Sequence, residues 1–265
     1  MTNSNRVFIL PYSMKSMSPR SLAEKLGVRR ILTKGSNYYP RHGDTIIYWG
    51  HGRDLSPATL INPPSAVSKC TNKIRFFEAC ERSKDHPRVP VWTTSPWTAH
   101  GMHAKGVNLV VRREVASSQG RGAEILNGRH GSNLEHDIDA FPKAPLYTVL
   151  VEDVTEFRIH VMDGNIIYKQ QKLRKNNHDH ARSELIRSYD NGWVFSSNLR
   201  FYKEDIGDQA IKAVRACGLD FGAVDMLWSH KDSKAYALEV NSAPGIEAGS
   251  LDAYAEAFKK KLSLK

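Results

Sequence analysis

Two neighbouring stretches near the C-terminus decide the fold: GAVDMLW at residues 222–228, and AYALEVN at residues 235–241, which runs directly into SAPG at residues 242–245. Both stretches are largely apolar, and a polar turn around Lys231 separates them, as in two strands joined in a hairpin. We therefore expect the two strands to pair, with a turn after the second strand that ends it at an exposed rim.

Three oxygen-bearing side chains, Asp225, Glu239 and Asn241, interrupt the apolar pattern of these strands. Because side chains alternate along a strand, Glu239 and Asn241 point to one face, and Asp225 can face them if the strands pair. Three hard oxygen ligands on one face suit Mg²⁺, with phosphate oxygens completing its coordination. On spacing alone, three polar groups on the wet face of a sheet fit equally well. The apolar neighbours and the adjacent turn favour a metal site.

Two further hairpins are expected upstream. Residues 157–161 and 166–169 alternate and are joined by Met-Asp-Gly-Asn, a strong hairpin signal. Residues 108–113 read as a strand, followed by the loop Ser-Ser-Gln-Gly-Arg-Gly at 117–122 and by a second strand at 123–126. Glycines and small hydroxyl residues let backbone N–H groups approach phosphate oxygens, although an ordinary flexible hairpin tip has the same composition.

The N-terminal part reads as a βαβ unit. Strands are expected at 6–10, 28–32 and 45–50, with a helix N-capped by Ser18 and ended by Gly27 between the first two. We also expect a strand at 147–151 and helices at 67–82, 97–105, 205–217 and 251–262.

These elements predict an α/β fold, with an N-terminal βαβ lobe followed by two α+β lobes. The expected boundaries are 1–65 for the N-terminal lobe, 66–146 for a central lobe with a phosphate-covering loop, and 147–265 for a C-terminal lobe with the metal site.

Four cations lie on or beside the expected strands: Arg112, Arg158, Lys172 and Arg174. Arginine within a strand is costly unless it is paired, so each could simply pair with a carboxylate. Their placement around a glycine-bearing loop and three oxygen ligands favours phosphate contact instead.

The order of these pieces resembles the ATP-grasp superfamily, in particular its ribosomal-protein glutamate ligase and D-alanine ligase branches. The likeness rests on Val-Val-Arg before the 117–122 loop, EFRIHVMDG at 156–164, GAVDML at 222–227 and LEVNSAPG at 238–245. It extends roughly from residue 62 to the C-terminus, and before that it is only architectural. The resemblance implies two lobes that clasp ATP, and a ligase that joins a carboxylate to an amine through an acyl-phosphate.

The resemblance also implies roles for individual residues. Asp225, Glu239 and Asn241 match the magnesium ligands. Arg112 stands where the family has a phosphate-binding lysine, and arginine keeps the charge of that lysine without its shape. The flexible lid over the phosphates corresponds to Ser117, Ser118, Gly120 and Gly122.

The remaining implied roles concern the nucleotide and the transferred phosphate. Val149 and Val151 would line the adenine, and either Glu152 or Glu156 would hold the ribose. The catalytic cations facing the transferred phosphate or the acyl-phosphate would be Arg158, Lys172 and Arg174. The implied cofactors are ATP and Mg²⁺, and the implied substrates are a small-molecule or peptide carboxylate and an amine.

The net charge is also compatible with a different class of protein. The formal net charge is +10, from 38 Lys and Arg against 28 Asp and Glu, and such a balance attracts anions. Basic residues surround Tyr38, Tyr39, Tyr48 and Trp49, which favours a nucleic-acid-binding protein as the alternative. A nucleic-acid-linked acceptor would reconcile both interpretations, and an ATP-grasp kinase is the rival among enzymes.

The composition is that of a soluble globular protein. Apolar residues make up 40% of the chain, and no apolar run is long enough for a membrane span. The start of the sequence lacks the apolar stretch of a secretory signal. The three cysteines, Cys70, Cys80 and Cys217, do not make a disulfide framework. We therefore expect a cytoplasmic protein without membrane partners.

Overall fold

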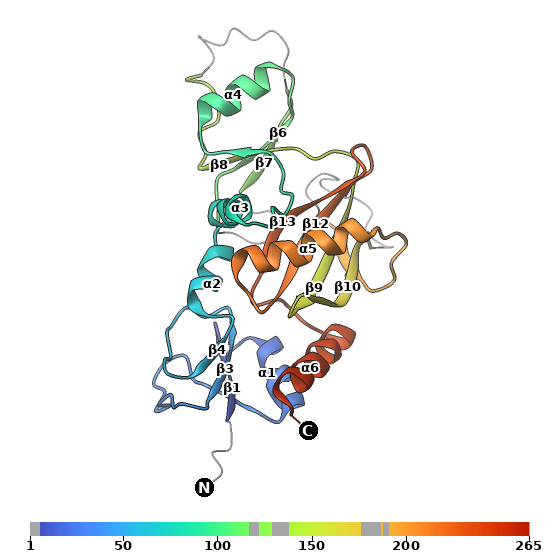
Figure 1. Cartoon of the computed structure of the whole chain (residues 1–265). Helices are drawn as coiled ribbons and strands as arrows, with labels where there is room; N and C mark the ends of the chain where they lie inside the picture. Colours follow the sequence, from blue (N-terminus) through green and yellow to red (C-terminus); the bar gives the residue numbers. More distant parts are fainter. Residues whose placement is uncertain (1–5, 117–121, 129–137, 176–186, 188–190, 265) are drawn as a thin grey trace.

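Three sheets follow one another along the molecule in the computed structural model (Figure 1). The structure describes residues 6–116, 122–128, 138–175, 187 and 191–264. The N-terminal sheet lies at one end, a five-stranded sheet lies in the middle, and a smaller four-stranded sheet lies at the other end. The predicted α/β class is confirmed.

The N-terminal sheet is parallel and has the strand order β2-β1-β3-β4. The predicted βαβ unit is present, but its fourth strand was not foreseen. Gly27 ends the first helix in a left-handed conformation, as predicted. Ser18 is not the N-cap: the helix begins one residue before it, and its hydroxyl accepts a hydrogen bond from Ile246 N at 3.0 Å. The elements are β1 (Val7–Pro11), α1 (Met17–Leu26), β2 (Arg29–Arg30), β3 (Thr45–Trp49) and β4 (Thr59–Ile61).

Two short helices lead along the chain from this sheet to the small sheet at the other end of the molecule. A single helix was predicted at 67–82, but the structure has α2 (Pro64–Cys70) and α3 (Lys73–Arg82). Asn72 separates them, because its side chain accepts hydrogen bonds from Ile74 N and Arg75 N at 2.9 and 3.3 Å and so caps a new helix.

The small sheet at the far end has the order β5-β8-β6-β7 and is antiparallel. The pairing of β6 with β7 confirms the hairpin predicted around the 117–122 loop. The elements are β5 (Trp92–Thr93), α4 (Pro96–Ala104), β6 (Leu109–Arg112), β7 (Ala123–Leu126) and β8 (Leu146–Val149).

The middle sheet is antiparallel with the order β11-β10-β9-β12-β13. One face packs on α5, where apolar residues such as Phe157, Val224 and Met226 meet Ile206 and Val214. The opposite face is covered in part by α6 and otherwise faces the small sheet (Figure 1). The elements are β9 (Val154–Met162), β10 (Asn165–Arg174), β11 (Trp193–Ser196), α5 (Glu204–Cys217), β12 (Phe221–Ser229), β13 (Lys234–Asn241) and α6 (Ala248–Leu262).

The pairing of β12 with β13 contains one irregularity. Asp225 lies opposite Glu239, whereas Met226 lies opposite Ala237, so Leu238 is an extra residue on β13. Such a bulge shifts the alternation of side chains by one position. As a result, Leu238 and Glu239 both face away from the core, while Ala237 and Val240 on either side of them are buried.

The N-terminal sheet is joined firmly to the middle sheet. The buried side chain of Asn62 donates to Phe221 O at 2.9 Å and accepts from Asp220 N at 2.8 Å. The rings of Trp49 and Phe221 stack with centroids 5.2 Å apart. Gly50 then passes so close to the turn after β13 that a Cβ on it would lie 2.6 Å from the Cβ of Ala243.

No helix in the described parts of the chain has the length and apolar character that a membrane crossing requires.

The contact at Gly50 predicts a specific loss of stability. We expect Gly50→Ala to lower the free energy of unfolding by about 2–4 kcal/mol, because it adds a steric overlap to the cost of a positive φ of 75°. Gly27→Ala is the matched control: its φ is 65° but a Cβ there meets nothing within 4 Å, so it carries only the backbone cost.

Urea unfolding of both variants tests this difference. The double variant Gly50→Ala/Ala243→Gly should recover the steric part of the loss. Equal losses in Gly50→Ala and Gly27→Ala would contradict a close contact between the two sheets at this point.

Candidate functional site

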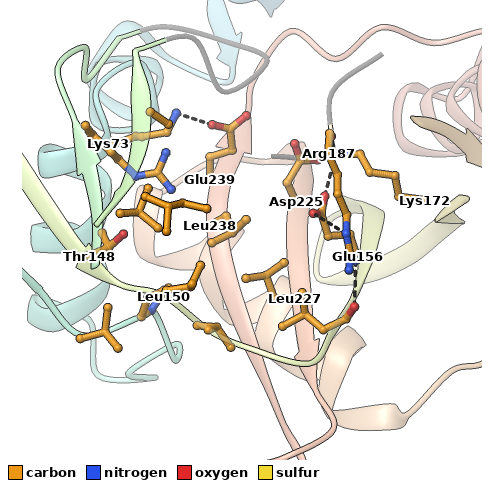
Figure 2. Close-up of a pocket in the computed structure, with 18 residues that line it drawn as sticks. Lys73, Thr148, Leu150, Glu156, Lys172, Arg187, Asp225, Leu227, Leu238 and Glu239 are labelled. Carbon is orange, nitrogen blue, oxygen red and sulfur yellow. Dashed lines mark hydrogen bonds and ion pairs between the residues drawn. The ribbon is translucent and has the colours of Figure 1, made fainter. Parts of the chain in front are cut away.

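A cavity, here called the main cavity, lies between the small sheet and the middle sheet (Figure 2). Leu150, Leu227 and Leu238 point into the space between the sheets, and the pair of Lys73 and Glu239 borders it (Figure 2). The apolar lining comes from both sheets and from the segment that joins them, and includes Val110, Ile125, Val149, Leu150, Val151, Leu227 and Leu238. The charged lining comprises Lys73, Arg112, Glu156, Lys172, Arg187, Asp225 and Glu239.

Asp225 is held by Arg158 from the neighbouring strand. The two residues lie opposite each other in β12 and β9, and the guanidinium donates from Nε and Nη2 to the two carboxylate oxygens at 2.6 and 2.8 Å. Burial raises the pKa of Asp225, but the Arg158 cation outweighs it and holds that pKa below its usual value. Arg158 therefore lies behind Asp225 and pairs with it, and not with Glu156.

Glu239 faces the same cavity from β13. Its carboxylate accepts a hydrogen bond from Lys73 Nζ at 2.5 Å. Lys73 is the first residue of α3, where a cation opposes the helix dipole, so its position there is better explained by this contact than by helix stability.

Arg112 is the unusual member of the charged set. Its Nε atom is buried and has no hydrogen-bond partner among the described residues. Burial lowers the pKa of Arg112, and the nearby Glu239 carboxylate partly offsets this. A buried donor without a partner costs free energy, roughly 1–3 kcal/mol or more for a charged group. Such a cation at the wall of a cavity is suited to an anionic ligand.

Two aromatic rings on β11 support the other cations. The guanidinium of Arg158 lies 4.2 Å from the ring centroid of Phe195, and Lys172 Nζ lies 5.0 Å from the same centroid. Arg187 lies over Trp193 at 4.8 Å. Lys172 Nζ also donates to Glu156 at 2.6 Å. The cations on this side of the cavity are thus fixed by carboxylates and by the faces of aromatic rings.

A second cavity adjoins the first where the N-terminal sheet, α2–α3 and the end of β13 meet. Lys73 and Glu239 line both cavities. The other lining residues of the second cavity include Tyr12 and Gly50 from the N-terminal part, Phe76 from α3, and Asn241, Ser242 and Ala243 after the bulge.

The structure brings together most, but not all, of the residues singled out in the sequence. The main cavity is lined by Arg112, Val149, Val151, Glu156, Lys172, Asp225 and Glu239. Asn241 lines the second cavity with Glu239. Glu152 lies elsewhere, in a third hollow beyond residues 149–151, where Asn108 donates to it at 2.5 Å.

Other predicted site residues lie outside these cavities. Arg174 is exposed and lines neither cavity. Gly122 precedes β7 with a φ of 68°. Ser117, Ser118 and Gly120, predicted to form the lid, lie outside the described residues.

The sequence interpretation missed Lys73 and Arg187 as lining residues. The signal for Lys73 was available, because a lysine directly after an Asn N-cap is unfavourable unless it has another role. Arg187 has no comparable local signal, since it lies in a polar segment and its position depends on the distant backbone carbonyl of Val154 as well as on the nearby ring of Trp193.

The cavity between the two antiparallel sheets has an apolar part and a charged part. Its lining suits an anionic ligand that also has an apolar part. The sequence matches no protein-family model and no curated protein. The structure, however, resembles solved proteins over nearly its whole length, and the chain has the ATP-grasp fold.

Three solved structures illustrate this likeness. The ATP-grasp ligase PsnB complexed with minimal precursor, Mg and ADP has a TM-score of 0.62 at 15% identity and covers 97% of this chain and 99% of its own. A Chryseobacterium gregarium RiPP-associated ATP-grasp ligase in complex with ADP and a leader and core peptide has a TM-score of 0.63 at 15% identity, covering 99% and 98%. D-Alanine–D-alanine ligase from Bacillus anthracis has a TM-score of 0.65 at 13% identity, covering 98% and 97%. The likeness therefore includes the N-terminal sheet.

His160 is buried beside Arg158 on the cavity-side face of β9. Its ring nitrogens lie 3.1 Å from Gln170 Oε1 and 3.3 Å from the Tyr254 hydroxyl. Burial is the main cause that lowers the pKa of His160 to about 4, and the Arg158 cation adds to it. The imidazole is therefore neutral in the folded protein at neutral pH.

This shift predicts a pH dependence of stability. The unfolded chain binds a proton at His160 below about pH 6.5, whereas the folded protein does so only near pH 4, so stability falls as the pH decreases between these values. We expect a loss of about 2 kcal/mol at pH 5 relative to pH 7.5 from this residue. Urea unfolding of wild type and His160→Gln at both pH values isolates the contribution of His160 to this loss of stability. An equally steep loss in the variant would show that His160 is not its source.

Proposed function

We propose that this protein is an ATP-dependent carboxylate–amine ligase that works through an acyl-phosphate. The observation that carries the proposal is that two cavities share Lys73 and Glu239. A nucleotide in the main cavity would have its terminal phosphate beside this pair, and a carboxylate substrate could reach the same point from the second cavity.

The main cavity has the chemistry that a nucleotide requires. The apolar side chains between the sheets fit a purine ring, and residues 148–151 border the same slot. The charged end supplies Lys73, Arg112 and Lys172 for phosphate oxygens. The unpartnered Nε of Arg112 supports this placement, because a phosphate would provide the acceptor that the described residues do not.

The donor set fits Mg²⁺. Asp225 and Glu239 are directly opposite each other on paired strands, and Asn241 follows two positions after Glu239. Carboxylate and amide oxygens are hard ligands, and magnesium commonly takes only a few protein ligands together with substrate phosphates. Bound there, the ion would neutralise charge on the transferred phosphoryl group. Asp225, Glu239 and Asn241 are the residues that would hold it.

The reaction that suits this arrangement has two displacements. A carboxylate oxygen attacks the terminal phosphorus of ATP, the bond to ADP breaks, and an acyl-phosphate forms. An amine then attacks the acyl carbon and loses a proton, inorganic phosphate leaves, and an amide remains. Lys73, Arg112 and Lys172 stabilise the negative charge that develops, and the closed slot between the sheets limits access of water. Positioning and charge supply the catalysis, and no nucleophilic side chain is required.

Peptides are the substrates to test first. Two of the similar structures are of proteins bound to a precursor or to a leader and core peptide, and a third is of an enzyme that acts on D-alanine. We propose that the carboxylate and the amine are carried by a peptide or an amino acid.

The division of the chain into three lobes, with boundaries at residues 65/66 and 146/147, is also a proposal.

The proposed reaction predicts coupled products. Incubation with ATP, Mg²⁺ and a panel of amino acids and short peptides should release ADP and phosphate and give a condensed product detected by mass spectrometry. Glu239→Gln should lower ADP release by at least about a hundredfold, because it removes a charged metal ligand, while Glu256→Gln on the exposed side of α6 should have no effect. A phosphorylated product formed without an amine would identify a kinase instead.

Arg112 provides a test of the nucleotide site that does not need the acceptor. We expect Arg112→Ala to weaken binding of Mg–ATP by about tenfold to a hundredfold, because a charge-assisted hydrogen bond is lost. Its thermal stability should not fall, since the removed cation has an unpartnered buried donor. Arg113→Ala is the matched control, because Arg113 is exposed and pairs with Glu124. Normal Mg–ATP affinity in Arg112→Ala would remove Arg112 from the site.

A further inference from the structure

The outer face of the N-terminal sheet carries basic residues that line neither cavity. We propose that this face docks an acidic segment of a polypeptide. The basic face consists of the exposed side chains of Arg29, Lys34, Tyr39, Arg41 and His42. It is a binding surface separate from the two cavities, and none of these residues lines either of them.

The position of this face follows from how the sheet is covered. One side of the sheet packs on α1 and α6 through Ile9, Ile47 and Trp49. The other side packs instead on loop residues, and its cluster contains Phe8, Ile46, Tyr38 and Leu55. In Figure 1 both helices lie on the same side of β1, β3 and β4, and the long loops lie on the other side. The loop that carries the basic face is therefore open to a partner.

Buried contacts hold this loop in place. Asp44 accepts two hydrogen bonds from Arg6 at 2.8 Å each, one from the Tyr38 hydroxyl at 2.6 Å and one from Arg41 N at 3.1 Å. The Phe8 ring lies 4.8 Å from the Tyr38 ring and 5.6 Å from the guanidinium of Arg29. A surface fixed in this way loses less conformational entropy when it binds.

The charge of this region is strongly one-sided. Residues 6–61 contain nine Lys and Arg against three Asp and Glu, and residues 28–43 contain no acidic residue. Of the three acids, Glu24 pairs with Arg20, Asp44 is 2% exposed and fully engaged, and the exposed Asp54 accepts hydrogen bonds from Ser56. The positive charge is therefore not cancelled locally. Such a surface attracts and orients an acidic partner.

The structure favours a polypeptide over a nucleic acid. Single-stranded nucleic acids bind basic surfaces by stacking bases on exposed aromatic rings. Tyr48 and Trp49 are 0% exposed, and Tyr38 is engaged with Asp44, so among these aromatics only Tyr39, at 82%, offers its ring. The basic face also adjoins β2, an edge strand of the sheet, which can pair with an extended chain.

Direct binding tests the proposal on the full-length protein. Fluorescence anisotropy with an end-labelled poly-glutamate peptide should show binding that weakens with salt. Lys34→Gln/Arg41→Gln should weaken it by at least about fivefold, because two surface ion pairs are lost. Adding Arg29→Gln should weaken it further. The double variant leaves the Phe8 contacts intact, so it separates charge from folding.

A matched variant controls for overall charge. Lys84→Gln/Lys260→Gln removes two exposed cations elsewhere and should leave peptide binding unchanged. Equal weakening in the control variant, or no peptide binding by wild type, would overturn the proposal. A single-stranded oligonucleotide of equal charge that binds more tightly than the peptide, and loses affinity in Lys34→Gln/Arg41→Gln, would also overturn it. None of these results depends on ATP turnover.

Discussion

The arrangement of charged residues in the main cavity depends on the ion pair between Arg158 and Asp225. It joins β9 and β12, which are neighbouring inner strands of the middle sheet, at directly opposite positions. Removing two charges from water is costly, and loss of one partner would leave the other partly buried without its counter-charge. The bidentate geometry and the Phe195 ring above Arg158 offset that cost. The pair thereby supports the strand register that also places Glu156 and Glu239.

The carboxylates around the main cavity have cationic partners, but one of its cations has a buried donor without an acceptor among the described residues. Asp225, Glu239 and Glu156 each accept a hydrogen bond from a cation, whereas the buried Nε of Arg112 has no partner in the described part of the chain. A metal ion at Asp225 and Glu239 therefore competes with Arg158 and Lys73 for the same oxygens. A polyanion removes this competition, because it gives the cations other acceptors. Metal and polyanion are thus expected to bind cooperatively.

The sequence was informative where the signal was local. Gly27 and Gly218 end helices in left-handed conformations, and the Asp163-Gly164 hairpin is present. The expected hairpin of the strands that carry Asp225 and Glu239 is also present, and the two residues lie opposite each other in it. The sequence misled where long-range packing decides. Arg158 and Asp225 are 67 residues apart, so their pairing has no local signature. Tyr48 and Trp49 lie among basic residues in the sequence, yet the fold buries both completely.

The bulge at Leu238 separates two tasks within one strand. Without this residue, β13 would alternate regularly, with Ala235, Ala237 and Val240 in the core and Tyr236, Glu239 and Asn241 opposite. The added leucine changes neither set, and it contributes one more apolar side chain to the slot. A change in the length of the strand at this point can therefore reshape the floor of the cavity while leaving the core and the charged residues in place. Insertion and deletion, as well as substitution, are open to evolution here as ways of altering what the slot accepts.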